Sequence, residues 1–165
     1  MGYSLLTREF VIRLQNKKEN SELNDYKVFC FNGEPKVTLV CSERFSDGAL
    51  REDFFDEQWS HVLIRRLGHP ISNTVIPKPV NFEQMKRLAN RLSQIIPFLR
   101  VDFYEIDKKL YFGELTFYPA SGFEEFEPDE WDYNLVNGYI CQGGNRHENT
   151  NWCRYCTHII KSTIF

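Results

Sequence analysis

The alternation of hydrophobic and polar residues predicts a hairpin in the first third of the chain. Tyr26–Phe31 and Lys36–Cys41 are rich in β-branched and aromatic residues, and they flank the dipeptide Asn32-Gly33. Asn-Gly supplies the positive φ angles that both central positions of a type I′ turn require. Pro35 is expected at the strand entrance, where its missing N–H removes no ladder hydrogen bond. The next segment, Ser42–Glu57, is charged and is expected to be irregular.

A period of 3.6 residues then predicts a helix after Asn81. Asn81 is placed to cap its N-terminus, Gln84 stands three residues later as in a capping box, and Pro97 ends it. The apolar residues that recur at helical spacing, and are expected to face the core, are Phe82, Met85, Leu88, Ala89, Leu92, Ile95 and Ile96. Hairpins with one amphipathic helix predict an α+β fold, in which helices cover a mostly antiparallel sheet.

Alternation with a period of two returns in Phe98–Ile106 and Leu110–Tyr118, which predicts a second hairpin. We expect residues 107–109 to form a three-residue loop between the two strands. The pairs expected across this loop are Ile106 with Leu110, Tyr104 with Phe112, and Asp102 with Glu114.

Asp102 and Glu114 are the candidate metal ligands of this hairpin. Directly opposed side chains have Cβ atoms about 4.5–5.5 Å apart, and two like charges at that distance repel each other. A hard cation such as Mg²⁺ relieves the repulsion and prefers oxygen ligands. The alternative is an ordinary ion pair between Asp102 and Arg100, because the two residues share one face of the strand.

The composition fits one soluble domain of 165 residues, with 42% hydrophobic and 15% aromatic residues. The net charge of −3 gives no indication of nucleic-acid binding. The N-terminal MGYSLLTREF lacks the features of a signal peptide, and no apolar run approaches the ~20 residues of a membrane span. Five cysteines, an odd number, favour a reduced cytoplasmic protein over a disulfide framework.

Three segments resemble the C-terminal part of the TupA-like (teichuronopeptide-biosynthesis) branch of the ATP-grasp superfamily. They are DYKVFCFNGEPK (Asp25–Lys36), FLRVDFYEIDKKLYFGELTFYP (Phe98–Pro119) and the SGF…F…W-D that follows, and the resemblance runs roughly from Glu9 to Asn134. It implies two α+β lobes that clamp ATP and Mg²⁺ and activate a carboxylate as an acyl phosphate. It also implies cell-surface polysaccharide or peptidyl-polymer synthesis, in a branch whose members are often labelled polysaccharide-biosynthesis proteins or glycosyltransferases.

The resemblance also implies roles for individual residues. Asp102 and Glu114 match the two Mg²⁺-binding acids of the superfamily, and Thr116 stands where an Asn is the usual third ligand. Lys27 and Arg44 match catalytic contacts to phosphate or substrate, and Glu9 and Lys27 are the expected nucleotide contacts. Arg100 shares the strand face of Asp102 and is a third candidate catalytic residue, expected to contact a phosphate or a carboxylate. Positive charge suits such contacts, because phosphoryl transfer depends on neutralising developing negative charge.

The family's upstream lobe, with its glycine-rich loop, is expected to be missing from this chain. Residues 1–135 are therefore predicted to be a partial C-terminal lobe that is inactive or nearly so by itself. Its expected partners are a nucleotide, a small-molecule or polymer acceptor, and a separate N-terminal lobe. The alternative is a non-catalytic remnant or a partner subunit.

Residues 136–165 depart from the family and are expected to be a divergent, poorly ordered tail that arose by frameshift or gene disruption. The tail contains residue types that bind Zn²⁺ tetrahedrally, at Cys141, Cys153, Cys156 and His158. A zinc-binding module is therefore a third hypothesis. A single Cys-x-x-Cys without a second pair is a weak signal, so the sequence favours a tail without zinc.

Overall fold

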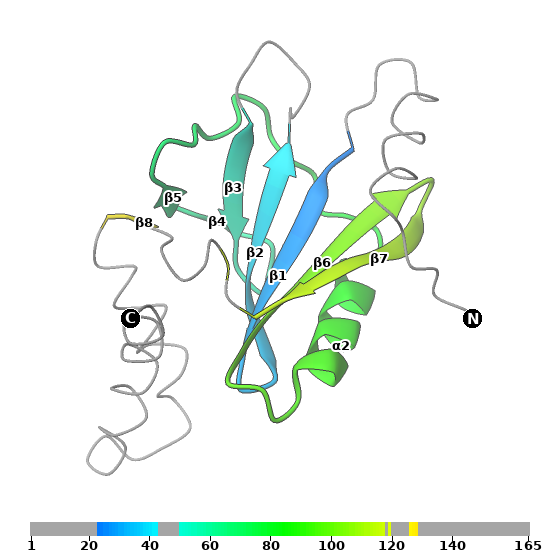
Figure 1. Ribbon diagram of the computed structural model, residues 1–165. Helices are drawn as coiled ribbons and strands as arrows, with labels where there is room; N and C mark the ends of the chain where they lie inside the picture. Colours follow the sequence, from blue (N-terminus) through cyan, green and yellow to red (C-terminus); the bar gives the residue numbers. More distant parts are fainter. Residues whose placement is uncertain (1–22, 43–49, 118, 120–125, 129–165) are drawn as a thin grey trace.

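The computed structural model describes residues 23–42, 50–117, 119 and 126–128. Within these ranges the chain forms a six-stranded antiparallel sheet, a two-stranded sheet and one helix (Figure 1). The predicted α+β fold with a mostly antiparallel sheet is therefore confirmed at this level. No helix in the described ranges is long and apolar enough to cross a membrane.

The large sheet has the strand order β4-β3-β2-β1-β6-β7. Its strands are β1 (Asp25–Phe31), β2 (Glu34–Ser42), β3 (Arg51–Phe55), β4 (His61–Val62), β6 (Phe98–Ile106) and β7 (Lys109–Thr116). The small sheet pairs β5 (Arg65–Arg66) with β8 (Phe126–Glu127), and the helix is α2 (Phe82–Ser93). This order places β1 and β6 side by side, which brings the two segments of the predicted site into contact.

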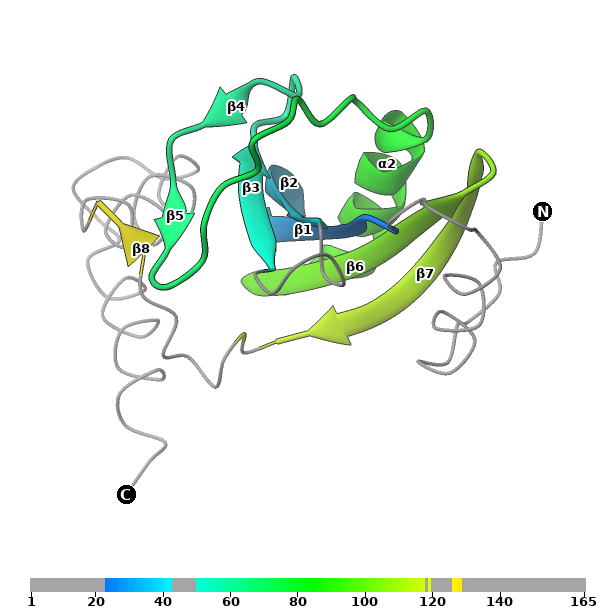
Figure 2. The same cartoon turned by 90° about the horizontal axis from the view of Figure 1, so that it is seen from above.

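Both faces of the large sheet are covered by hydrophobic residues. Helix α2 packs on one face (Figure 2), over a core that contains Tyr26, Val28, Cys30, Val40, Phe55, Ile76, Phe82, Met85, Ala89, Leu99, Val101 and Phe103. The opposite face has its own cluster, made of Phe29, Phe31, Val37, Leu39, Cys41, Phe54 and Ile64. Because successive side chains of a strand point to opposite faces, Lys27 and Asp102 lie on the face opposite α2.

The first hairpin forms as predicted. Asn32 and Gly33 have φ angles of 51° and 85°, and Phe31 pairs with Glu34 across the two-residue turn. The register shifts by one residue between Phe29 and Cys30. This bulge lets β2 begin earlier than expected and still place its hydrophobic residues on the correct faces.

The prediction that Ser42–Glu57 is irregular is wrong, because β3 lies within it and pairs with β2. The sequence of β3, REDFF, hides the strand because it buries two acids. Arg66 Nη1 donates to Glu52 Oε1 at 2.9 Å, and His61 Nε2 lies 2.9 Å from Asp53 Oδ1. The two buried acids are thus satisfied by hydrogen-bond partners from neighbouring segments, which allows them to stand where a strand pattern would have apolar residues.

Helix α2 begins where predicted, but Asn81 does not cap it with its side chain. Asn81 Nδ2 instead donates to Glu105 Oε2 and to the carbonyl oxygen of Lys108, both at 2.9 Å. Glu105 accepts the backbone N–H groups of Asn81 at 2.7 Å and of Val80 at 3.2 Å. An acid from the second hairpin therefore holds the start of the helix, which no local sequence motif shows.

The helix ends at Ser93, earlier than the spacing predicts. Ile95 lies beyond it with a φ of 63° and a fully exposed side chain, and Leu92 is 41% exposed. The expectation that these two residues face the core is wrong. Ile96 also lies outside the helix, although its side chain does pack against the core.

Candidate functional site

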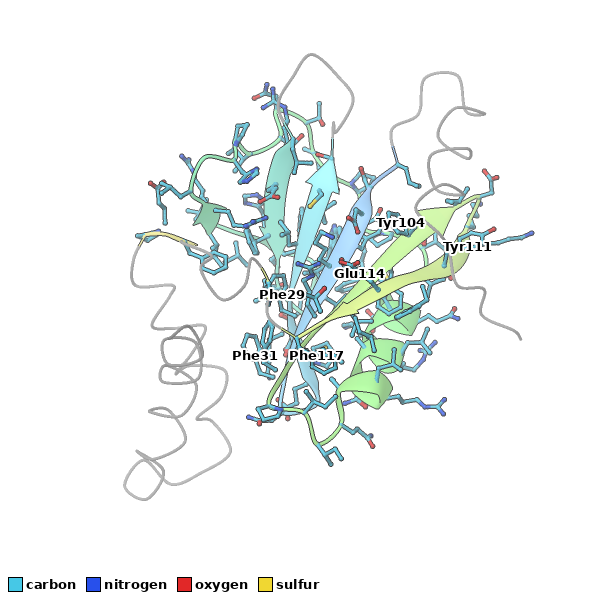
Figure 3. The ribbon with its side chains drawn as sticks, viewed as in Figure 1. Phe29, Phe31, Tyr104, Tyr111, Glu114 and Phe117 are labelled. Carbon is cyan, nitrogen blue, oxygen red and sulfur yellow. The ribbon has the colours of Figure 1, made fainter. Side chains whose placement is uncertain are left out.

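Charged side chains from β1, β6 and β7 meet on the sheet face opposite α2. We call these side chains, together with the neutral Thr116 that contacts Glu114, the charged cluster: Asp25, Lys27, Arg100, Asp102, Glu114 and Thr116. Lys27 pairs directly with Asp102 across β1 and β6. Figure 3 shows Glu114 between Tyr104 and Tyr111 toward one end of the sheet and Phe29 and Phe31 toward the other. Five residues that the sequence analysis singled out therefore lie together.

The second hairpin reaches the predicted pairing by a different route. Its loop has two residues, Asp107 and Lys108, with φ angles of 51° and 60°, so the expected three-residue loop is wrong. The observed partners are Ile106 with Lys109 and Tyr104 with Tyr111. The register shifts between Val101 and Phe103, and beyond the shift Arg100 pairs with Thr116.

This bulge restores the predicted geometry at the candidate ligands. Gly113 and Glu114 both face Asp102, so the expected proximity of Asp102 and Glu114 survives the error in the loop. A Cβ atom at Gly113 would lie 3.1 Å from the carbonyl oxygen of Asp102 and 3.1 Å from Tyr104 Cε2. Glycine suits this close approach, because a Cβ atom here would require Asp102 or Tyr104 to shift by a few tenths of an ångström.

Asp102 is the centre of the charged cluster, and its side chain is only 2% exposed. Its Oδ1 accepts from Arg100 Nε at 2.8 Å, and its Oδ2 accepts from Arg100 Nη2 at 2.9 Å. Lys27 Nζ donates to the same Oδ2 at 2.6 Å. The alternative interpretation of the sequence, an ion pair between Arg100 and Asp102, is therefore present in the structure.

Lys27 is held between two buried acids. Its Nζ lies 2.7 Å from Asp25 Oδ2 and 2.6 Å from Asp102 Oδ2. Burial by itself lowers the pKa of Lys27. The charges of Asp25 and Asp102 and their hydrogen bonds raise the pKa by a larger amount, so the net shift is upward. Lys27 is consequently a fixed positive charge, unsuited to act as a base or as a neutral nucleophile.

Glu114 and Thr116 form the outer edge of the cluster. Arg100 Nη2 donates to Glu114 Oε1 at 3.0 Å, and Thr116 Oγ1 donates to the same oxygen at 3.3 Å. Glu114 is 65% exposed, in contrast to Asp102. One guanidinium therefore bridges the two predicted metal ligands, from a buried carboxylate to one that is open to solvent.

The donor chemistry of the cluster fits a hard cation. Asp102, Glu114 and Thr116 offer only oxygen atoms, which Mg²⁺ prefers. Three carboxylates face two cationic side chains here, so the formal charge of the cluster is −1. Two acids and a hydroxyl are a small ligand set, and no group of three or more His, Cys, Asp or Glu side chains within the described ranges is arranged to hold a metal ion. Substrate oxygens would have to complete the coordination shell, as is common for Mg²⁺.

The sequence analysis missed two buried acids on this face. Asp25 lies within the DYK segment but drew no attention, because an acid at a strand end resembles a turn residue. Glu52 is 1% exposed and binds Arg66 Nη1 through both oxygens, at 2.9 and 3.1 Å, while His69 Nδ1 lies 3.8 Å away. The sequence did contain a signal for such buried acids: acidic residues stand inside strand segments, and arginine and histidine residues that could pair with them follow later in the chain.

Other predicted site residues lie outside the described ranges. Glu9 and Arg44 are among them, and their roles stay predictions. The proposed zinc ligands of the tail, Cys141, Cys153, Cys156 and His158, also lie outside. The same holds for the boundary proposed at residue 135.

Comparison with known families gives one match. Residues 2–140 match the family model described as TupA-like ATPgrasp. Comparisons with curated proteins and with solved structures gave no match.

Proposed function

The chain belongs to the TupA-like ATP-grasp family, and from this membership we propose that its charged cluster binds the phosphates of ATP together with Mg²⁺. The observation that carries the proposal is the meeting of Lys27, Arg100, Asp102, Glu114 and Thr116 on one sheet face. These five residues come from three strands and two distant segments of the sequence.

The charge of each residue in the cluster sets the role that we propose for it. Asp102 and Glu114, assisted by Thr116, would hold Mg²⁺, which supplies neutralisation of phosphate charge when it is bound. Lys27 would stay fixed between Asp25 and Asp102 as a permanent cation. Arg100 would contact a phosphate or a carboxylate of the substrate, because its planar guanidinium binds such groups through paired hydrogen bonds.

The formal charge of −1 on the cluster affects how the nucleotide can bind. An anion should be repelled by the cluster alone, whereas an anion that arrives with a divalent cation meets a positive site. We therefore propose that ATP binds in a strictly metal-dependent manner. The finer activity that we propose is that of an ATP-grasp carboxylate–amine ligase in cell-surface polysaccharide or peptidyl-polymer synthesis, supported by the family membership and the motifs around Lys27 and Asp102.

Isothermal titration calorimetry of the 165-residue chain with ATP tests this proposal. We expect binding with excess Mg²⁺ and at least a tenfold weaker affinity with excess EDTA. Asp102→Asn should abolish the metal-dependent part. Asp107→Asn is the matched control, because it removes an acid from the same hairpin at a turn position where Asn is favoured. Equal affinity with Mg²⁺ and with EDTA, or equal loss in the two variants, would contradict the proposal and favour a non-catalytic remnant.

A further inference from the structure

The geometry points to a second role for Arg100, and this inference rests on the proposed function because it concerns the same acids. We propose that, when no metal is bound, the guanidinium of Arg100 bridges Asp102 and Glu114, the two carboxylates that would coordinate the metal. Metal binding and the release of Arg100 from Asp102 are then one exchange. The bridge would regulate when the site accepts a metal and when Arg100 becomes available to substrate.

The contacts of Arg100 leave little room for a cation on Asp102. The guanidinium binds both oxygens of that carboxylate, Oδ1 through Nε at 2.8 Å and Oδ2 through Nη2 at 2.9 Å. Nη2 also reaches Glu114 Oε1 at 3.0 Å. A divalent ion on the same oxygens would lie beside a like charge within a few ångströms, and that repulsion is strong in a partly buried site. Lys27 keeps its contact with Asp102 Oδ2 at 2.6 Å, so Arg100 must withdraw from Asp102 Oδ1 and Glu114 Oε1 before these two oxygens can coordinate a metal.

Arg100 and Lys27 are similarly buried, with side chains 11% and 13% exposed, and they differ in the exposure of their carboxylate partners. One carboxylate that Arg100 contacts lies at the open edge of the cluster, because Glu114 is 65% exposed. Lys27 is enclosed by Asp25 and Asp102, whose side chains are 4% and 2% exposed. Withdrawal of Arg100 would break contacts with one buried and one solvated carboxylate, whereas withdrawal of Lys27 would break ion pairs with two buried carboxylates.

The released guanidinium has a suitable new partner in the proposed substrate. Arg binds phosphate and carboxylate groups with the same paired geometry, so the phosphate of a metal–nucleotide complex would replace the carboxylate of Asp102. A phosphate that arrives without a metal finds the guanidinium already occupied. The bridge therefore adds a reason for metal-dependent nucleotide binding beyond the net charge of the site.

Binding of Mn²⁺, measured by electron paramagnetic resonance without nucleotide, tests the bridge. Arg100→Met keeps the length of the side chain and removes its charge, so the variant should bind Mn²⁺ about tenfold to a hundredfold more tightly than the wild type. Arg100→Lys keeps the charge but loses the planar fork that binds both oxygens of Asp102, and it should show a smaller gain. Arg87→Met, on the exposed side of α2, is the control for net charge and should leave Mn²⁺ affinity unchanged.

The possible outcomes separate the bridge from the site. Tighter binding by Arg100→Met that disappears in Arg100→Met/Asp102→Asn supports the bridge. If the wild type binds Mn²⁺, and both Arg100→Met and Arg100→Lys bind it with equal or weaker affinity, the proposed bridge is wrong and the proposed metal site is retained. No Mn²⁺ binding by any of the variants overturns both proposals. Circular dichroism establishes that each variant is folded, and Arg100→Lys carries the test if Arg100→Met is not.

Discussion

Replacing Lys27 with Met tests how strongly burial shapes the charged cluster. The Nζ of Lys27 lies 2.7 Å from Asp25 Oδ2 and 2.6 Å from Asp102 Oδ2, and those acids are 4% and 2% exposed. Met preserves the shape of the side chain but leaves both carboxylates without this cation. Removing one partner of a buried ion pair costs about 3–5 kcal/mol. We expect a loss of about 3 kcal/mol in the free energy of unfolding, at the lower end because Arg100 still binds Asp102.

Lys36→Met is a close control for this substitution. Lys36 Nζ also contacts two acids, Glu34 Oε2 at 2.8 Å and Glu57 Oε1 at 3.0 Å. The two lysine side chains are similarly exposed, 13% for Lys27 and 18% for Lys36, but Glu34 and Glu57 are 67% and 38% exposed. Ion pairs with exposed partners contribute less than about 1 kcal/mol, so Lys36→Met should be nearly neutral.

Urea unfolding near neutral pH, followed by circular dichroism and tryptophan fluorescence, measures both losses. A second substitution, Asp102→Asn in the Lys27→Met background, removes one of the stranded charges and should recover part of the loss. Equal losses for Lys27→Met and Lys36→Met would refute the reasoning. That result would mean that water reaches Asp25 and Asp102 and that burial does not strengthen their ion pairs.

Three further predictions concern the same sheet. The pKa of Lys27 is raised above 10.5, so its stabilising contribution is present below that pH and is lost as the pH rises through the higher folded value; the stability difference between wild type and Lys27→Met should narrow only in strong alkali. Gly113→Ala should lower the free energy of unfolding by about 1–3 kcal/mol and speed amide exchange in β7, because its Cβ would press on Asp102 and Tyr104. Burial raises the pKa of the Cys30 thiol to about 11, so iodoacetamide at about pH 8 should modify Cys30 only after unfolding, as peptide mass mapping would show.

Each of these predictions has a clear contradicting result. Narrowing of the Lys27 difference near neutral pH would mean that the carboxylates do not raise the pKa of the lysine. Unchanged stability in Gly113→Ala would show that β7 does not approach Asp102 as closely as the bulge requires. Fast alkylation of native Cys30 would place that thiol at the surface and contradict the packing of α2 on β1.

Local signals in the sequence predict the hairpins and the helix but not their details. Asn32-Gly33 fixes the first turn because few residues adopt positive φ at both central positions. The second turn also has positive φ angles, 51° at Asp107 and 60° at Lys108, but no glycine marks it, so the sequence predicts a loop that is one residue too long. The compensating bulge at Gly113 brings this residue close to Asp102 and Tyr104, and these contacts cannot be inferred from the sequence.

The acidic residues on this face of the sheet could likewise be predicted only in part. Asp102 and Glu114 could be paired from strand alternation, because the pattern of their own hairpin is regular. The partners of Glu52, which are Arg66 and His69, could not be predicted because they come from a later segment that the fold brings beside β3. Asp25 was not predicted although its partner Lys27 lies two residues away on the same strand, because alternation alone does not show that the pair is buried. Likewise, Glu105 replaces the expected Asn81 cap through a contact between distant segments.

Localisation of bound Mn²⁺–ATP by nuclear magnetic resonance tests the central claim most directly, because a paramagnetic ion broadens the signals of nearby nuclei. We predict that substoichiometric Mn²⁺ with ATP broadens the amide signals of Lys27, Asp102 and Glu114 first. Signals of α2, on the other face of the sheet, should stay sharp at the same concentration. Broadening that centres on any other part of the chain, or that is unchanged in Asp102→Asn, would contradict the assignment of the charged cluster as the metal–nucleotide site.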